Sequence, residues 1–139
     1  MLIKEIMTKN VITINPNESV YDACVKYRDN KIGCLVVTDK ETCVGIVTER
    51  DLIERTMCLH KDPDKTKISE IISYNVKTIQ SLDTLDNALE LMKKFKIKKL
   101  PVMSEKALVG VITITDIAKA RPELTRRFID SWVKPRWED

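Results

Sequence analysis

Two short segments of the chain share a pattern of residues that could bind the sugar of a nucleoside. Gly45 to Asp51 reads Gly-Ile-Val-Thr-Glu-Arg-Asp, and Gly110 to Asp116 reads Gly-Val-Ile-Thr-Ile-Thr-Asp. In each segment the first threonine stands where a predicted strand leads into a helix, and the aspartate follows three residues later. A carboxylate at that turn can accept hydrogen bonds from both hydroxyls of a ribose, while the threonine hydroxyl and free helix N–H groups face a sugar or phosphate.

The same pattern also has a purely structural explanation. Thr48 and Thr113 are good helix N-caps, and Asp51 and Asp116 suit the positive end of a helix dipole. A glycine inside a strand marks either a bulge or a close approach by backbone or ligand. These residues alone therefore leave both explanations open.

The pattern occurs twice because the chain contains an internal repeat. Residues 3–54 and 68–119 align without a gap at a constant offset of 65 positions, with 16 identities over 52 positions. Composition alone would give about three identities. Two equal halves that share one core explain this repeat better than a solenoid, whose units are shorter and more numerous.

Each copy of the repeat carries the same order of secondary-structure signals. A short extended piece (11–14 and 76–79) precedes a helix-capping residue, Ser19 in one copy and Thr84 in the other. Two strands and a short second helix follow, so the predicted unit is β-α-β-β-α. The predicted strands cover 34–37, 43–48, 100–103 and 107–113, and the apolar positions at helical spacing are Val20, Ala23, Cys24, Tyr27, Leu85, Ala88, Leu89 and Met92.

Composition places the chain among soluble globular proteins. It has 139 residues, of which 43% are hydrophobic and 32% are charged, which favours one compact domain. The net charge of +3 demands neither a nucleic acid nor a membrane as partner. No apolar run approaches the roughly 18 residues of a membrane span, and the N-terminus lacks the apolar core of a signal peptide. We therefore expect a cytoplasmic protein.

The residues that most often bind metals or catalyse reactions are few. Cys24, Cys34, Cys43 and Cys58 form no C-x-x-C pair, and the single His60 lies in a charged, loop-like stretch. We expect the four cysteines to be buried as small apolar side chains rather than metal ligands. No G-x-S-x-G or P-loop motif is present, so we predict no catalytic residue, no metal site and no required cofactor.

In combination these features resemble the CBS domain, and the tandem pair resembles a stand-alone Bateman module. The resemblance rests on the opening Ile3 to Thr8, the segment Ile97 to Val102 and the two glycine-to-aspartate elements. It implies an α+β fold of two tandem β-α-β-β-α CBS repeats related by a pseudo-twofold axis, with sheets packed face to face and a C-terminal helix added. We expect the first repeat with its linker at 1–64, the second repeat at 65–120, and an amphipathic helix and tail at 121–139.

The resemblance also implies a function. CBS pairs are non-catalytic regulatory modules that dimerise and bind AMP, ADP, ATP or S-adenosylmethionine in clefts between the repeats. The implied partners are therefore an adenosine-type ligand, a second copy of the chain and a separate effector protein. The family positions that hold the ribose and phosphate correspond to Asp51, Asp116, Thr48 and Thr113, with Gly45 and Gly110 beside them. Adenine is expected against Asn10, Val11 and Ile12 in one cleft and against Asn75, Val76 and Lys77 in the other.

Two lysines make the predicted clefts unequal. Lys98 and Lys99 stand where the family commonly places basic residues for the phosphates of a ligand whose ribose the other repeat holds. They would then serve the Asp51 cleft, whereas the equivalent residues Gly33 and Cys34 depart from that pattern. The Asp51 cleft is thus expected to prefer a phosphorylated nucleotide, and the Asp116 cleft a less anionic adenosine derivative or nothing. The alternative is that these lysines only decorate a helix C-terminus and a solvated edge.

The C-terminal segment suggests a second possible function. Pro122 suits a helix start, and the helix would either cover the core or bind a second subunit. Together with the lysine-rich patch Lys93–Lys99, it could serve a nucleic-acid or protein-binding adaptor. Residues 121–139 hold five basic and four acidic side chains, a net of +1, which attracts phosphate poorly and argues against nucleic acid. The apolar positions of this helix are Leu124, Phe128, Ile129, Trp132 and Val133.

Overall fold

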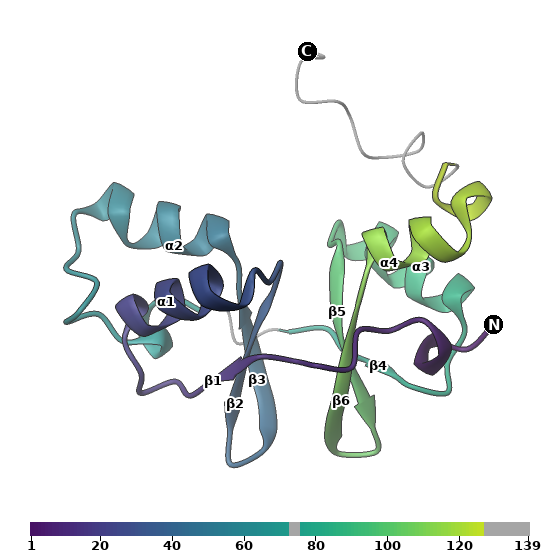
Figure 1. The fold of residues 1–139 in the computed structure, drawn as a ribbon, viewed down its shortest axis with the longest axis horizontal. Helices are drawn as coiled ribbons and strands as arrows, with labels where there is room; N and C mark the ends of the chain where they lie inside the picture. The colour runs from purple at the N-terminus through teal and green to yellow at the C-terminus, as the bar shows by residue number, and fades with distance from the viewer. Residues whose placement is uncertain (73–75, 127–139) are drawn as a thin grey trace. The chain divides into compact units, whose positions relative to one another are not determined.

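The computed structural model describes residues 1–72 and 76–126, which belong to two compact units. Residues 10–76 form one unit, here called the N-unit (Figure 1). Residues 1–9 and the described residues from Lys77 to Arg126 form the other, here called the C-unit. Each unit contains one three-stranded sheet.

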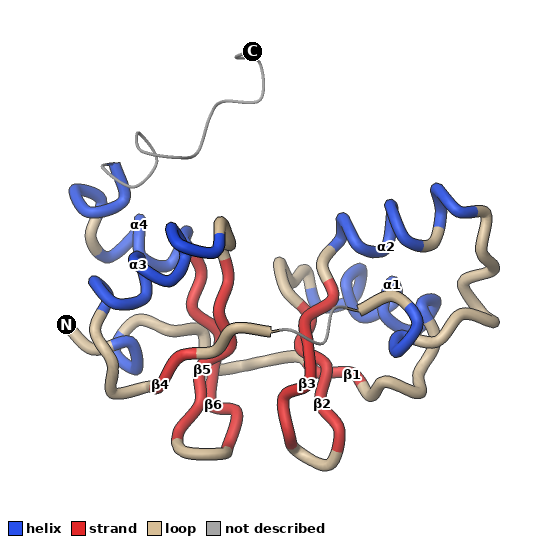
Figure 2. Tube along the Cα trace, turned by 180° about the vertical axis from the view of Figure 1, so that it is seen from behind, coloured by secondary structure: helices blue, strands red, loops and turns tan. Residues whose placement is uncertain are grey.

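The N-unit has the element order predicted for the first repeat. Its sheet has the order β1-β2-β3, with β1 parallel to β2 and β2 antiparallel to β3. A parallel pair needs a crossover connection, which helix α1 provides. Figure 2 shows both helices of the unit on the same side of its strands. The elements are β1 (Thr13–Ile14), α1 (Val20–Asn30), β2 (Leu35–Asp39), β3 (Thr42–Val47) and α2 (Glu49–Arg55), followed by short 3-10 helices at Met57–Leu59 and Ile68–Glu70.

The C-unit repeats this topology with strand order β4-β5-β6. The predicted α+β fold with a β-α-β-β-α unit in each repeat is therefore confirmed. A further helix begins at Pro122, as predicted, and is described as far as Arg126. The elements are a 3-10 helix (Ile3–Glu5), β4 (Ile79–Gln80), α3 (Leu85–Phe95), β5 (Lys99–Ser104), β6 (Ala107–Thr113) and α4 (Ile114–Ala120).

The predicted caps start the two long helices. At α1, the Ser19 hydroxyl accepts a hydrogen bond from the Asp22 N–H at 3.0 Å, and the Asp22 carboxylate accepts one from the Ser19 N–H at 3.2 Å. At α3, the Thr84 hydroxyl accepts one from the Asn87 N–H at 3.2 Å. Such caps satisfy N–H groups that have no partner within the helix, and each stabilises a protein by about 1 kcal/mol.

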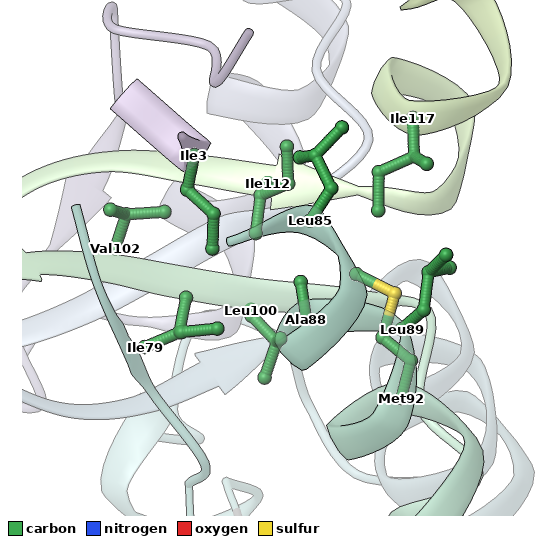
Figure 3. Packing of buried hydrophobic residues seen from close by; sticks show 10 residues of the cluster. All are labelled: Ile3, Ile79, Leu85, Ala88, Leu89, Met92, Leu100, Val102, Ile112 and Ile117. Atoms are coloured by element: carbon green, nitrogen blue, oxygen red, sulfur yellow. The ribbon is translucent and has the colours of Figure 1, made fainter. Parts of the chain in front are cut away.

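The core of the C-unit lies between its helices and its sheet. Figure 3 shows α3 and α4 directing apolar side chains toward residues of β4, β5 and β6. The periodic positions predicted for α3 all belong to this cluster. Its ten buried members are Ile3, Ile79, Leu85, Ala88, Leu89, Met92, Leu100, Val102, Ile112 and Ile117.

One member of that core comes from the start of the chain. Ile3 is fully buried in the C-unit, and its N–H donates to the Asp83 carbonyl at 2.9 Å. Farther along the same segment, Thr8 and Val111 exchange two backbone hydrogen bonds of 2.9 and 3.0 Å. The opening segment of the first repeat is thus built into the unit that carries the sheet of the second repeat.

The equivalent segment of the second repeat is built into the N-unit. Ile68 is fully buried there, and its N–H donates to the Glu18 carbonyl at 2.9 Å. Ile71 and Ile72 belong to the same cluster of buried residues. The compact units and the sequence repeats therefore have different boundaries, because each repeat contributes its opening segment to the other unit.

The paired glycines both lie beside a β-bulge. Gly45 pairs with Val37 and Gly110 pairs with Val102, and the strand register shifts immediately after each of these partners. At Gly110 a Cβ atom would lie 2.7 Å from the Met7 sulfur and 2.8 Å from the Thr8 carbonyl oxygen. The structural explanation therefore accounts for Gly110, because the opening segment crosses it too closely for any side chain.

The prediction that all four cysteines are buried is wrong for two of them. Cys34 is buried and Cys43 is half-buried, and burial raises the pKa of the Cys43 thiol. Cys24 and Cys58 are exposed. On α1 only Val20 and Ala23 are fully buried, whereas α3 buries four residues. The buried face of α1 is therefore narrower, and Cys24 lies outside that face.

Candidate functional site

The Asp51 turn begins helix α2 in the N-unit. The Thr48 hydroxyl accepts a hydrogen bond from the Asp51 N–H at 3.2 Å, and Asp51 Oδ2 accepts one from the Thr48 N–H at 2.9 Å. This reciprocal pair is a capping box with Asp in place of Glu. The side chain of Asp51 retains 23% of its exposure, so its carboxylate is fixed in direction and still reachable.

Asp51 has a basic neighbour that the sequence analysis did not identify. The Nε of Arg55 lies 3.8 Å from Asp51 Oδ1, the oxygen that takes no part in the cap. The same guanidinium donates through Nη1 to the Ile71 carbonyl at 2.7 Å. Arg55 therefore connects α2 to the segment that follows the 3-10 helix Ile68–Glu70.

The Asp116 turn repeats this geometry at the start of α4 in the C-unit. The Asp116 N–H donates to the Thr113 hydroxyl at 3.1 Å, and the Thr113 N–H donates to Asp116 Oδ2 at 3.0 Å. Here the additional neighbour is Thr8, whose hydroxyl lies 3.5 Å from both carboxylate oxygens. That distance is at the outer limit of a hydrogen bond.

Both turns leave acceptor capacity on their carboxylates. A carboxylate offers about four lone-pair sites, and each cap uses one of them. The unused sites of Asp51 and Asp116 can accept hydrogen bonds from vicinal hydroxyl groups such as those of ribose. The caps explain why the threonine and aspartate occur together, and they also hold each carboxylate in one orientation.

The predicted phosphate-binding lysines lie at the start of β5. Lys99 pairs with Thr113 in the sheet, and the Lys98 carbonyl accepts a hydrogen bond from the Ile114 N–H at 2.9 Å. The backbone of both lysines therefore lies next to the Asp116 turn of the same unit. The Lys98 side chain is exposed and Lys99 is half-buried. Their assignment to the phosphates of a ligand held by Asp51 stays a prediction.

The segments predicted to contact adenine lie at the entries to β1 and β4. In the N-unit Asn10 is exposed, whereas Val11 and Ile12 are half-buried. Asn75 lies outside the described residues. Val76 and Lys77 are half-buried, and the Lys77 ammonium lies 4.5 Å from the centre of the Phe95 ring, which places a cation–π contact beside this segment.

The remaining predictions about the lysine patch and the tail are only partly covered by the described residues. Within the patch, Lys93, Lys94 and Lys96 are exposed. Leu124 packs against the core of the C-unit. The other apolar residues predicted for the C-terminal helix, Phe128, Ile129, Trp132 and Val133, lie outside the described residues.

No helix among residues 1–72 and 76–126 is long and apolar enough to cross a membrane. In the same part of the chain, no group of three or more His, Cys, Asp or Glu side chains is placed to hold a metal ion.

Thr8 and Arg55 are the two neighbours that sequence reasoning missed. Thr8 is 108 positions from Asp116, so no local pattern links the two residues. Arg55 lies one helical turn after Asp51, a spacing at which opposite charges commonly pair. That spacing could have indicated the ion pair from the sequence.

Comparison with protein families gives two matches along the chain. The model of the CBS domain matches residues 3–57 and again residues 68–123. Among curated proteins, YlbB of Bacillus subtilis is 33% identical over 118 residues, covering 84% of this chain and 79% of YlbB. Hypoxic response protein 1 of Mycobacterium tuberculosis is 26% identical over 121 residues, covering 86% of this chain and 85% of that protein.

Solved structures with the same fold are also tandem CBS proteins. A putative signal-transduction protein with CBS domains from Burkholderia ambifaria aligns with a TM-score of 0.80 and 26% identity, covering 88% of this chain and 96% of its own. A hexameric CBS-CP12 protein from bloom-forming cyanobacteria aligns with a TM-score of 0.78 and 26% identity, covering 91% of this chain and 73% of its own. The structure of Hypoxic Response Protein I contains two coordinated zinc ions and aligns with a TM-score of 0.78 and 25% identity, covering 86% and 98%.

Proposed function

Because the chain belongs to the CBS-domain family, whose members are regulatory ligand-binding modules, we propose that it senses an adenosine-containing ligand without catalysing a reaction. The ligand is AMP, ADP, ATP or S-adenosylmethionine. Its ribose is held by Asp51 in one site and by Asp116 in the other. Ligand occupancy then changes how the module meets a separate effector protein.

The observation that carries this proposal is the pair of matching aspartate turns. Both carboxylates are held by a cap through Oδ2, and both keep acceptor sites that ribose hydroxyls can use. Because a duplicated repeat also duplicates its turns, the duplication alone does not identify a ligand. The proposal of ribose rests on the chemistry of a fixed carboxylate beside a threonine hydroxyl, which suits vicinal hydroxyl groups.

A thermal-unfolding panel tests the proposed ligand class. The full chain is heated alone and with AMP, ADP, ATP, NAD, S-adenosylmethionine or GMP at equal concentration. A ligand at about 100 times its Kd stabilises the folded state by about 2.7 kcal/mol, which raises the midpoint by several degrees for a protein of this size. We expect at least one adenosine compound to give such a shift and GMP to give none. Equal shifts with all six compounds, or none with any, would contradict the proposal.

We also propose that the module forms a homodimer through the outer surface of α2 and the turn that follows it. Ile53, Met57 and Leu59 are large apolar side chains that are all more than half exposed there. These three residues lie within seven positions of one another in the chain, and clustered exposed apolar side chains indicate an interaction site. The hexameric CBS-CP12 protein shows that a relative of similar fold self-associates.

Light scattering during size-exclusion chromatography checks the dimer. The unaltered chain is expected to elute with twice its monomer mass. The double variant Ile53→Glu/Met57→Glu is expected to elute with the monomer mass, because burying two carboxylates in an apolar contact is costly. The matched control is Leu82→Glu, which alters an equally exposed leucine of the C-unit. If the α2 variant keeps the mass of the unaltered chain, a different surface forms any oligomer.

A further inference from the structure

The two aspartate turns differ in the charge of their neighbours. Asp51 Oδ1 lies 3.8 Å from the guanidinium of Arg55, whereas the additional neighbour of Asp116 is the neutral hydroxyl of Thr8. By the offset of 65 residues, the position equivalent to Arg55 is Ala120. The charged neighbour is therefore a property of one repeat and not of the shared scaffold.

The surroundings of Asp51 make Arg55 important for any anionic ligand. Helix α2 carries acidic residues at Glu49, Asp51 and Glu54. Glu54 is paired with Arg50 at 2.7 Å, so these two charges offset each other. The first turn of α2 then carries the charges of Glu49 and Asp51, and Arg55 is the cation of this helix that remains to offset them.

Arg55 is also held in place rather than free to turn away. Its Nη1 donates to the Ile71 carbonyl at 2.7 Å, and Ile71 is 1% exposed within the core of the N-unit. A hydrogen bond from a charged donor to an anchored carbonyl restricts the side chain. This hydrogen bond therefore keeps the guanidinium close to the Asp51 carboxylate, although 48% of the Arg55 side chain is exposed.

We propose that Arg55 is a specificity-determining residue, which offsets the charge of Asp51 so that its site accepts a phosphorylated adenosine ligand. This inference rests on the proposed function of the site. Without a cation, a carboxylate that holds a ribose repels the phosphate attached to the same ribose. With the cation fixed next to it, that repulsion is reduced while the carboxylate still accepts hydrogen bonds from the hydroxyls.

The test compares AMP with adenosine, which share the ribose and base and differ in the phosphate. Titration calorimetry at low ionic strength is done in an Asp116→Ala background, so that only the Asp51 site reports. Arg55→Gln is the main variant, because it removes the charge and keeps a polar, unbranched side chain of the same aliphatic stem. Arg55→Lys restores the charge.

We expect Arg55→Gln to weaken AMP binding about three- to tenfold, the size of a partly screened charge interaction, and to change adenosine binding less. Arg55→Lys is expected to recover most of the lost preference for AMP. In an Asp51→Ala background, Ala120→Arg introduces the cation at the equivalent position of the Asp116 turn and is expected to increase the ratio of AMP to adenosine affinity there.

The possible outcomes separate this inference from the proposed function. Equal losses of AMP and adenosine affinity in Arg55→Gln, or no loss of either, would show that the charge does not select the phosphate, and only the inference would fall. If the Asp116→Ala protein binds neither compound although its thermal unfolding is cooperative, the Asp51 site is no ribose site, and the proposed function of this turn falls together with the inference.

Discussion

Replacing Asp51 and Asp116 together by alanine is expected to weaken AMP binding about 100-fold, because each site loses hydrogen bonds from the ribose hydroxyls to a charged acceptor. Hydrogen bonds to charged groups contribute about 1.5–3 kcal/mol each, so losing two of them corresponds to about 3 kcal/mol or more. The single variants are expected to remove one site each. Titration calorimetry with AMP measures the loss.

The loss of the helix cap needs a control of its own, because alanine at either position also breaks a capping box. Asp22 makes the same reciprocal pair with Ser19 at the start of α1, outside the proposed sites. Asp22→Ala should lower stability by about 1 kcal/mol and leave AMP affinity nearly unchanged. If Asp22→Ala weakens AMP binding as much as the other two, the aspartates act only through stability.

The largest expected effect on stability comes from the opening segment of the chain. Ile3→Ala should lower the free energy of unfolding by about 3 kcal/mol, as expected when a fully buried isoleucine is cut to alanine and leaves a cavity. Ile3 is 0% exposed and packs in the C-unit against residues more than 70 positions away in sequence. Urea unfolding followed by circular dichroism measures the change.

Leu82→Ala serves as the matched comparison for this prediction. Leu82 is 65% exposed, so its truncation is expected to change the free energy of unfolding by less than about 0.5 kcal/mol. An effect of Ile3→Ala as small as that of Leu82→Ala would mean that the opening segment does not belong to the core. The segment also matters for the site, because it holds Thr8 beside Asp116.

The secondary structure could be predicted from the sequence because its signals are local. Ser19 and Thr84 mark the starts of α1 and α3 through the side chain's own hydrogen bond to the third helical N–H. Apolar spacing then fixes the buried face of α3. The same spacing misplaced Cys24, since α1 has a narrower buried face and the apolar character of cysteine does not decide its burial.

The exchange of opening segments could not be predicted, for a reason inherent in the repeat. Ile3 and Ile68 are the same residue at equivalent positions of the two repeats. The pattern of apolar residues in the sequence is therefore the same whether an opening segment packs on its own repeat or on the other repeat. Only the three-dimensional structure places Ile3 in the core with Ile112 and Ile68 in the core with Val47.

The local part of the candidate site could be predicted from the sequence, and its long-range part could not. The threonine and aspartate of each turn follow from a short motif, and the structure brings each pair together as a capping box. Gly110 was identified by its position, and the structure shows that the opening segment requires it. Thr8 could not be found, since its proximity to Asp116 depends on the exchanged segment.

A crystal structure of the full chain with AMP tests the proposed ribose sites most directly. We expect the 2′- and 3′-hydroxyl oxygens to lie about 2.5–3.0 Å from a carboxylate oxygen of Asp51 or Asp116, with the cap hydrogen bonds retained. AMP bound with its ribose away from both aspartates, while their carboxylates serve only as caps, would contradict the proposed role of these residues.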